Sequence, residues 1–254
     1  MASAFCVLST RRTGSGYLCS LLDSHPAICC HQELFDRIDI GAVPVAPAVG
    51  DHEARARDPI RWLDTVIRAS SEHDPRWRKI GFKLHLLQWP SVLERILFEP
   101  GFAILLLDRA DRLAQYASQK IADATRLFKW TNDEPVPAVA VRFDADEFEA
   151  FARRHEDLYR MVRLVLRDRQ DVLELDYEHI FAPETQRAVQ GFLGVDPGVT
   201  LSAPERQQNP RDVLARFVNP DEVVSALRGT CWARYLPGLS LKGGRHGPRT
   251  PSPR

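Results

Sequence analysis

Apolar runs alternate with amphipathic segments along this chain, and each run is short enough to form a single buried strand. The stretch 102–107 is nearly all apolar, which is typical of a central strand in a parallel sheet. Helices are predicted where apolar residues recur every three or four positions, as at Leu18, Leu21 and Leu22. The predicted strands cover residues 4–9, 79–85, 102–107 and 172–175, and the predicted helices cover about 15–22, 59–70, 111–124, 144–166 and 183–192.

Strands that alternate with helices predict an α/β fold, in which helices flank a mostly parallel central sheet to give three layers. In such a P-loop-like fold the ligand site lies at the carboxyl ends of the strands. We expect one domain over residues 1–237. The tail at 238–254, rich in Gly, Pro, Arg and Ser, is predicted to be disordered, and 41–51 is predicted to be a surface loop.

Composition and charge narrow the class of protein. The chain has 254 residues, and its 34 Lys and Arg balance 34 Asp and Glu, so no global field favours nucleic acid as a partner. Residues 1–12 lack the long apolar region of a secretory signal, and no run of about 18 apolar residues occurs, so we expect a cytoplasmic protein without a membrane span.

The five cysteines are predicted to be reduced thiols that mostly serve packing, because they lack C-x-x-C spacing. They are Cys6, Cys19, Cys29, Cys30 and Cys231.

A polar, glycine-containing turn joins the first predicted strand to the first predicted helix. Its sequence is Thr-Arg-Arg-Thr-Gly-Ser-Gly-Tyr at 10–17. Backbone N–H groups and the helix dipole favour an anion at such a junction, and Arg12 adds a fixed positive charge. The Walker A pattern G-x-x-x-x-G-K-[ST] is absent, which argues against an ATPase or kinase. The turn therefore predicts an anion-binding loop of another type.

This loop resembles the 5′-phosphosulfate-binding loop of the sulfotransferase superfamily. A second element of that family, an Arg at a strand end followed nine residues later by a Ser on a helix, is matched by Arg109 and Ser118. The resemblance implies that these two residues bind the donor's 3′-phosphate. Gly16 departs from the family pattern, because many members carry Ser or Thr at its position, whereas the position of Tyr17 is aromatic or aliphatic in the family.

Further segments are similar to bacterial trehalose- and nodulation-factor-type sulfotransferases. They are His25-Pro26, Gln32-Glu33-Leu34-Phe35, Trp130, the late strand at 172–178, Arg206-Gln207-Gln208 and the region from Asn219 to Trp232. The resemblance implies transfer of a sulfuryl group from 3′-phosphoadenosine 5′-phosphosulfate (PAPS) to a hydroxyl group, with 3′-phosphoadenosine 5′-phosphate (PAP) as product and without a metal. A P-loop kinase or NTPase, or a nucleotide-binding protein without activity, remains the alternative.

Two residues compete for the role of general base. The resemblance implies Glu33 by analogy with the saccharide-type enzymes, and His85, in a Lys-x-His element, by analogy with the aryl and steroid type. On physical grounds a histidine suits base catalysis near neutral pH without tuning. The predicted catalytic residues are Glu33, His85 and Arg12, and the predicted donor-binding residues are Arg11, Arg12, Thr13, Gly14, Ser15, Gly16, Tyr17, Lys83, Arg109 and Ser118.

The acceptor is expected to be a saccharide, glycolipid or natural product. The loops at 41–58 and 135–142, which would select it, carry no recognisable code. Four tryptophans could stack on a sugar, but core packing is predicted for most of them: Trp62, Trp77, Trp89 and Trp130. The oligomeric state is left open, with a homodimer as one option.

Overall fold

The computed structural model describes residues 3–36, 52–128, 139–204 and 212–237. Contacts divide these residues into two compact units, which we call the first unit (3–108 and 165–204) and the second unit (109–164 and 212–237). The predicted loop 41–51, Trp130, Arg206 and the tail at 238–254 lie outside the described residues. A single domain over 1–237 stays a prediction.

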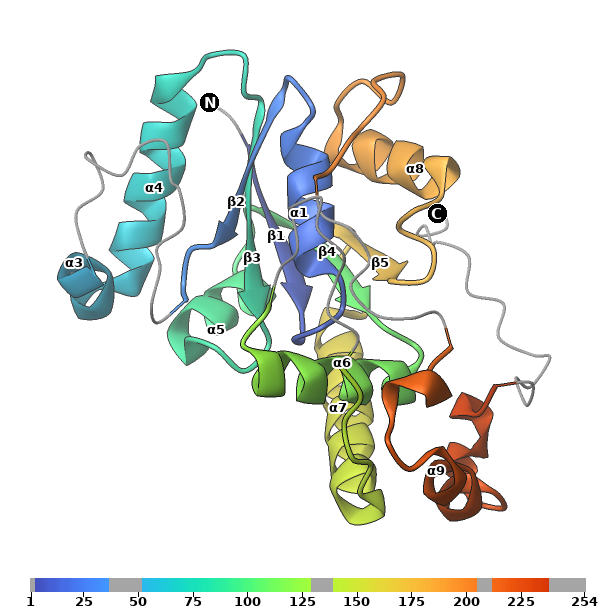
Figure 1. The fold of residues 1–254 in the computed structure, drawn as a ribbon. Coiled ribbons are helices and arrows are strands. Elements are labelled where there is room, and N and C mark those ends of the chain that lie inside the picture. Colours follow the sequence, from blue (N-terminus) through green and yellow to red (C-terminus); the bar gives the residue numbers. More distant parts are fainter. Residues whose placement is uncertain (1–2, 37–51, 129–138, 205–211, 238–254) are drawn as a thin grey trace. The chain divides into compact units, whose positions relative to one another are not determined.

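Five parallel strands make the sheet of the first unit (Figure 1). They are β1 (Ser3–Ser9), β2 (Ile28–Glu33), β3 (Lys79–His85), β4 (Phe102–Asp108) and β5 (Val172–Asp176), in the order β2-β3-β1-β4-β5. The predicted α/β class with a parallel sheet is confirmed. The hydrophobic pattern predicted every strand except β2, whose sequence ICCHQE is neither a continuous apolar run nor an alternation.

Helices cover both faces of this sheet. On one face, α1 (Ser15–Asp23) and α8 (Pro183–Leu193) pack on alternate residues of the strands, among them Val7, Leu105 and Leu173. On the other face lie α4 (Pro59–His73) and α5 (Pro90–Phe98), where the guanidinium of Arg95 lies over the ring of Phe102. A short helix, α3 (His52–Arg57), precedes α4.

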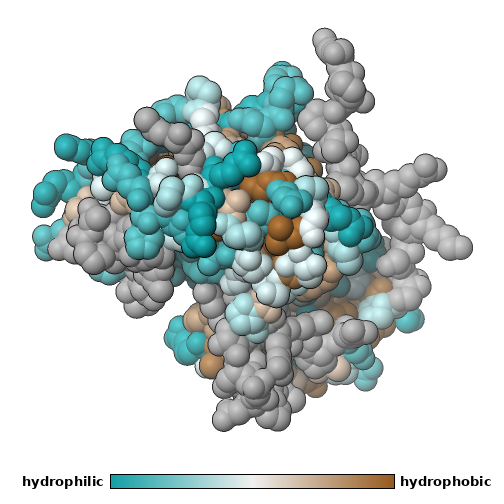
Figure 2. Space-filling view, turned by 90° about the horizontal axis from the view of Figure 1, so that it is seen from above, coloured by the Kyte–Doolittle hydropathy of each residue, from teal (hydrophilic) through white to brown (hydrophobic). Residues whose placement is uncertain are grey.

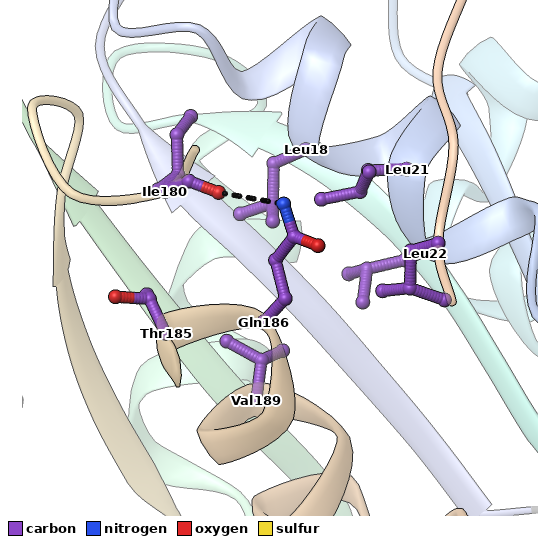
Figure 3. A pocket seen from close by; sticks show the side chains of 8 residues that line it. Leu18, Leu21, Leu22, Ile180, Thr185, Gln186 and Val189 are labelled. Carbon is purple, nitrogen blue, oxygen red and sulfur yellow. Dashed lines mark hydrogen bonds between the residues drawn. The ribbon is translucent and has the colours of Figure 1, made fainter. Parts of the chain in front are cut away.

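The contact between α1 and α8 is a closely packed apolar seam (Figure 3). Leu18, Leu21 and Leu22 of α1 face Val189 of α8, and the amide of Gln186 donates to the carbonyl of Ile180 at 3.4 Å. The depression between them leaves no space for a water molecule. This depression serves packing, and its lining residues include none of the candidate site residues.

The second unit is helical among its described residues. It contains α6 (Arg112–Thr125), most of α7 (Ala145–Leu166) and α9 (Pro220–Leu227), with 3₁₀ turns η1 (Leu214–Arg216) and η2 (Cys231–Tyr235). The carboxylate of Asp111 caps α6 by accepting from Ala114 N at 2.8 Å. Rings surround the buried Tyr116, whose hydroxyl donates to Glu147, and this aromatic core fixes the start of α6.

The surface and the cysteines of the described residues agree with the expectations drawn from the composition. The face in Figure 2 is mostly hydrophilic, with a small hydrophobic area between polar side chains. Among the described helices, none is both long enough and apolar enough to cross a bilayer. Four of the five cysteines are buried, and burial raises the pKa of Cys29 to about 12, so packing accounts for most of them, as predicted.

Candidate functional site

The loop after β1 turns sharply through two residues in the left-handed region. Arg12 has φ 61° and Gly14 has φ 78°. The hydroxyl of Thr13 donates to the carbonyl of Thr10 at 2.9 Å, which closes the turn. Gly14 is the N-cap of α1 and provides no side-chain hydrogen bond to the first turn of the helix. The N-terminus of α1 thus has no side-chain cap, an arrangement that suits an anion site, which stays a prediction.

Gly14 is required here for two independent reasons. Its positive φ is costly for any residue with a Cβ, and a Cβ at this position would lie 2.6 Å from Cδ2 of Tyr177. Tyr177 follows β5, and Phe181 contacts both Tyr177 and Tyr17, with ring centroids 5.4 and 4.9 Å apart. The segment after β5 thus packs directly against the loop. Tyr17 takes part in this packing.

A register shift at the end of β2 determines where Glu33 points. The pairing with β3 runs regularly to His31 opposite Phe82 and resumes at Glu33 opposite Lys83. Gln32 is the extra residue, as in a β-bulge, so both Gln32 and Glu33 lie opposite Lys83. In a regular strand Glu33, which lies two residues after His31, would be on the same face of the sheet as His31. The shift instead brings Glu33 to the face on which Lys83 and His85 project.

Glu33, Lys83 and His85 form a polar cluster at the carboxyl ends of β2 and β3. Oε1 of Glu33 lies 2.9 Å from Nζ of Lys83 and 3.5 Å from Nε2 of His85. The side chains of Lys83 and His85 are 6% and 9% exposed, whereas that of Glu33 is 24% exposed. The two predicted rivals for the base are therefore direct neighbours, and Glu33 also binds Lys83, the lysine predicted to reach the donor.

The cluster keeps Glu33 ionised. Burial alone would raise the pKa of the Glu33 carboxyl, but the hydrogen bond to His85 and the charge of Lys83 hold this pKa well below its ordinary value. The ion pair with Lys83 is largely removed from water, so loss of either partner would leave an uncompensated charge. The chain thus maintains a carboxylate at the sheet edge over the whole physiological pH range.

Two residues that the sequence analysis did not select support this cluster. Ser9, fully buried at the end of β1 and opposite His85 in the sheet, places its Oγ 3.4 Å from Nδ1 of His85. Gln32 donates from Nε2 to Oγ of Ser20 at 2.9 Å and to the carbonyl of Gly16 at 3.4 Å. No sequence motif identifies Ser9, because its role follows from strand pairing alone. Gln32 could have been suspected only as the neighbour of Glu33.

Arg109 and Ser118 belong to the second unit, where both are buried. Arg109 follows β4, and Ser118 lies within α6, one turn after Ala114. The guanidinium of Arg112 donates to the carbonyl of Arg109 at 2.6 Å and to Oε1 of Gln115 at 3.0 Å. The buried Arg216, another residue not selected from the sequence, donates to the carbonyl of Ala114 at 3.2 Å. Several arginines thus gather around the first turns of α6.

The structure brings part of the predicted site together. The loop residues Thr13 to Tyr17 and the cluster of Glu33, Lys83 and His85 lie in the first unit, at the ends of neighbouring strands. Arg11 is exposed and Arg12 is partly buried at the turn. Among the described residues, no group of His, Cys, Asp and Glu has an arrangement that could hold a metal ion.

Known proteins are similar to this chain over most of its length. Nodulation protein H of Rhizobium meliloti strain 1021 is 24% identical over 219 residues, which cover 84% of this chain and 82% of the relative. A second Nodulation protein H from Rhizobium meliloti is 27% identical over 209 residues, covering 74% and 81%. No protein-family model matches. The crystal structure of a sulfotransferase from Alicyclobacillus acidocaldarius covers 89% of this chain and 91% of its own, with 18% identity and a TM-score of 0.44.

A parallel sheet with a glycine-containing loop after its first strand defines a P-loop-like α/β fold. The chain is a distant relative of Nodulation protein H. Its resemblance to the sulfotransferases implies a transferase that takes its sulfuryl group from PAPS.

Proposed function

We propose that this protein transfers the sulfuryl group of PAPS to a hydroxyl group of a saccharide, glycolipid or natural product by in-line displacement. The observation that carries the proposal is the cluster of Glu33, Lys83 and His85 beside the anion loop. A carboxylate, an ammonium group and an imidazole at one sheet edge can together accept a proton and balance negative charge. Those are the two tasks that the displacement requires.

The loop is proposed to hold the 5′-phosphosulfate. As the bond from sulfur to the bridging phosphate oxygen breaks, the electron pair stays on that oxygen, and PAP leaves. The main-chain N–H groups of Thr13 to Gly16 and the guanidinium of Arg12 would bind this oxygen more strongly as its charge grows, which lowers the barrier. Lys83 would stabilise the oxygens of the transferring group.

Glu33 is proposed as the group that takes the acceptor's proton. Lys83 and His85 both contact Oε1, so Oε2 is the oxygen that can face the incoming hydroxyl. The low pKa of Glu33 is compatible with this role, because the acceptor oxygen becomes strongly acidic once its bond to sulfur forms. In that case a weak base is sufficient. His85 would orient the carboxylate.

His85 is the second candidate for the base, because an imidazole suits proton transfer near neutral pH. Its Nδ1 lies beside the hydroxyl of Ser9 and its Nε2 faces Glu33, so the ring would have to release one of these neighbours to take the acceptor's proton. Arg109 and Ser118 keep their proposed role as ligands of the donor's 3′-phosphate, a role supported by the family motif and by their burial.

Calorimetry tests the donor. PAP is expected to bind in the presence of a chelator, and ATP with Mg²⁺ is expected to bind much more weakly. Tight binding of ATP without PAP binding would contradict the proposal and favour the kinase or NTPase alternative. PAP binding without transfer to any member of a saccharide and glycolipid panel, followed by mass spectrometry, would favour a nucleotide-binding protein without activity.

Paired variants then test the base. Glu33→Gln keeps the size of the side chain but cannot take a proton and no longer balances the charge of Lys83, and we expect a loss of kcat of about 100-fold or more. His85→Asn, assayed with the same acceptor, should retain more activity if Glu33 is the base. The opposite order would assign the base to His85.

A further inference from the structure

The two peptide carbonyls that follow Glu33 are both bound by side chains from other elements. The guanidinium of Arg55 in α3 donates from Nη1 to the carbonyl of Leu34 at 2.6 Å. The indole Nε1 of Trp89 donates to the carbonyl of Phe35 at 2.9 Å. Since β2 has lost its regular pairing at this point, the strand ladder alone does not fix the chain after Glu33.

Arg55 and Trp89 also contact each other. The guanidinium carbon of Arg55 lies 5.5 Å from the ring centroid of Trp89 and 5.9 Å from that of Trp62. Arg55 is only 3% exposed, which is unusual for an arginine in a short helix. The ring of Phe35 lies 5.4 Å from Trp89 and 5.7 Å from Trp62. The arrangement is a cation held between two indoles.

The backbone of Trp89 is in an unfavourable conformation for its type. Its φ is 44° and its ψ is 75°, in the left-handed region that bulky residues rarely adopt. Such a conformation persists only where its surroundings impose it, and these sites concentrate around functional groups. Trp89 lies four residues after His85, and the intervening Gln88 binds both backbone groups of His85, with its N donating at 2.8 Å and its Oε1 accepting at 3.4 Å.

We propose that Trp89, together with Arg55, positions Glu33 against Lys83 and His85 by holding the two peptide carbonyls that follow it. Trp89 lies in the segment that follows β3, the strand that ends at His85. Its indole binds the segment that follows β2, the strand that ends at Glu33. Both are positioning residues, since neither touches the reacting atoms. This inference rests on the proposed function of the cluster.

The test compares two matched variants. Trp89→Phe keeps an aromatic ring but removes the N–H group that binds Phe35. Trp62→Phe is the control, because Trp62 contacts the same two residues while its Nε1 has no hydrogen-bond partner among the described residues. We expect Trp89→Phe to lower kcat roughly 10- to 100-fold, as for a small displacement of a catalytic group, and Trp62→Phe to leave it close to wild type. PAP affinity should be unchanged in both.

A second readout does not need activity. The ring-nitrogen chemical shifts of His85, assigned with His85→Asn and followed across pH by NMR, report its contact with Glu33. They should change in Trp89→Phe and in Arg55→Lys, which keeps the charge but loses the planar fork. They should not change in Trp62→Phe.

The outcomes separate the two proposals. Wild-type kcat and wild-type His85 shifts in Trp89→Phe would overturn the positioning role, as would equal effects of Trp89→Phe and Trp62→Phe. Absence of sulfuryl transfer by the wild-type protein would overturn the proposed function instead. The NMR comparison would still decide whether Trp89 and Arg55 position the Glu33 and His85 pair.

Discussion

The backbone conformation of single residues determines the shape of the anion loop. Arg12 adopts a left-handed conformation although it has a Cβ, and Gly14 does so under the ring of Tyr177. A non-glycine residue in this region is uncommon, and its cost must be offset by the contacts around it. We infer that this turn is held open for an anion at the expense of local stability.

Arg12→Ala should lower the rate of sulfuryl transfer by at least about 100-fold, the scale seen when one donor to a developing oxyanion is removed. The rate should be measured with saturating PAPS and an identified acceptor. Arg76→Ala, which removes an exposed arginine paired with Asp74, is the control and should be silent. Near-normal turnover of Arg12→Ala would refute its role.

Gly14→Ala should weaken PAP binding and lower the free energy of unfolding by about 1–2 kcal/mol or more, since the new Cβ meets Tyr177 and the φ is strained. Calorimetry and thermal unfolding measure the two effects. Gly191→Ala in α8 is the matched control, because nothing lies within 4 Å of its Cβ position and φ is not positive. That variant should be stabilised by about 0.5–1 kcal/mol. Equal behaviour of the two variants would contradict the explanation.

At the scale of single residues, the sequence identified candidate residues but not the contacts between them. Glu33 and His85 were predicted as rivals from two separate motifs, and the structure makes them direct neighbours. Ser9 was not predicted, because only the pairing of β1 with β3 brings it to His85. Contacts between strands far apart in the chain leave no local trace in a sequence.

At the scale of elements, prediction succeeded where the hydrophobic pattern was continuous. β1, β3, β4 and β5 were predicted within one or two residues, as were α1, α6, α7 and α8, and α4 was predicted within three. β2 was missed because His31, Gln32 and Glu33 interrupt its apolar run, and these polar residues are the ones that face Ser70, α1 and Lys83. Functional residues thus obscured the pattern of the strand that carries them.

Arg169, just before β5, ties three elements together. Its guanidinium donates to the carbonyls of Ile96 and Leu97 at the end of α5 and of Phe102 at the start of β4, at 2.7, 3.1 and 2.9 Å, and it pairs with Asp171. The last carbonyls of a helix have no partner within the helix, so this side chain caps α5.

Arg169→Ala should therefore lower the free energy of unfolding by roughly 2–3 kcal/mol, since hydrogen bonds to charged groups exceed neutral ones and the carbonyls would be left unsatisfied. Chemical denaturation measures the change. Arg167→Ala removes an exposed arginine that pairs only with its neighbour Asp168 in the described contacts, and it should have almost no effect. A similar loss in both variants would show that position 169 has no special role.

At the scale of the whole molecule, acid should destabilise the fold through a buried histidine. His31 is 5% exposed, lies 2.9 Å from Oγ of Ser70, and burial lowers its pKa to about 4 from an ordinary value near 6.5. The unfolded chain therefore binds the proton more readily than the folded one. The stabilisation is complete above pH about 6.5 and is lost as pH falls towards 4, by up to about 3 kcal/mol.

Urea denaturation of the wild type and of His31→Gln at a series of pH values measures this contribution, because other groups titrate equally in both proteins. The difference between the two curves should shrink as pH falls from about 6.5 to 4. A difference independent of pH would show that His31 does not remain neutral in the fold.

The extra residue in β2 has a consequence for how this protein can vary. A regular strand offers only every second residue to one face, yet here Gln32 holds α1 and Glu33 binds Lys83 from consecutive positions. Lengthening or shortening the chain by one residue between His31 and Glu33 would deprive the sheet of one of these two contacts. Relatives that keep the same chemistry are therefore expected to differ in length in their loops but to keep this short interval unchanged.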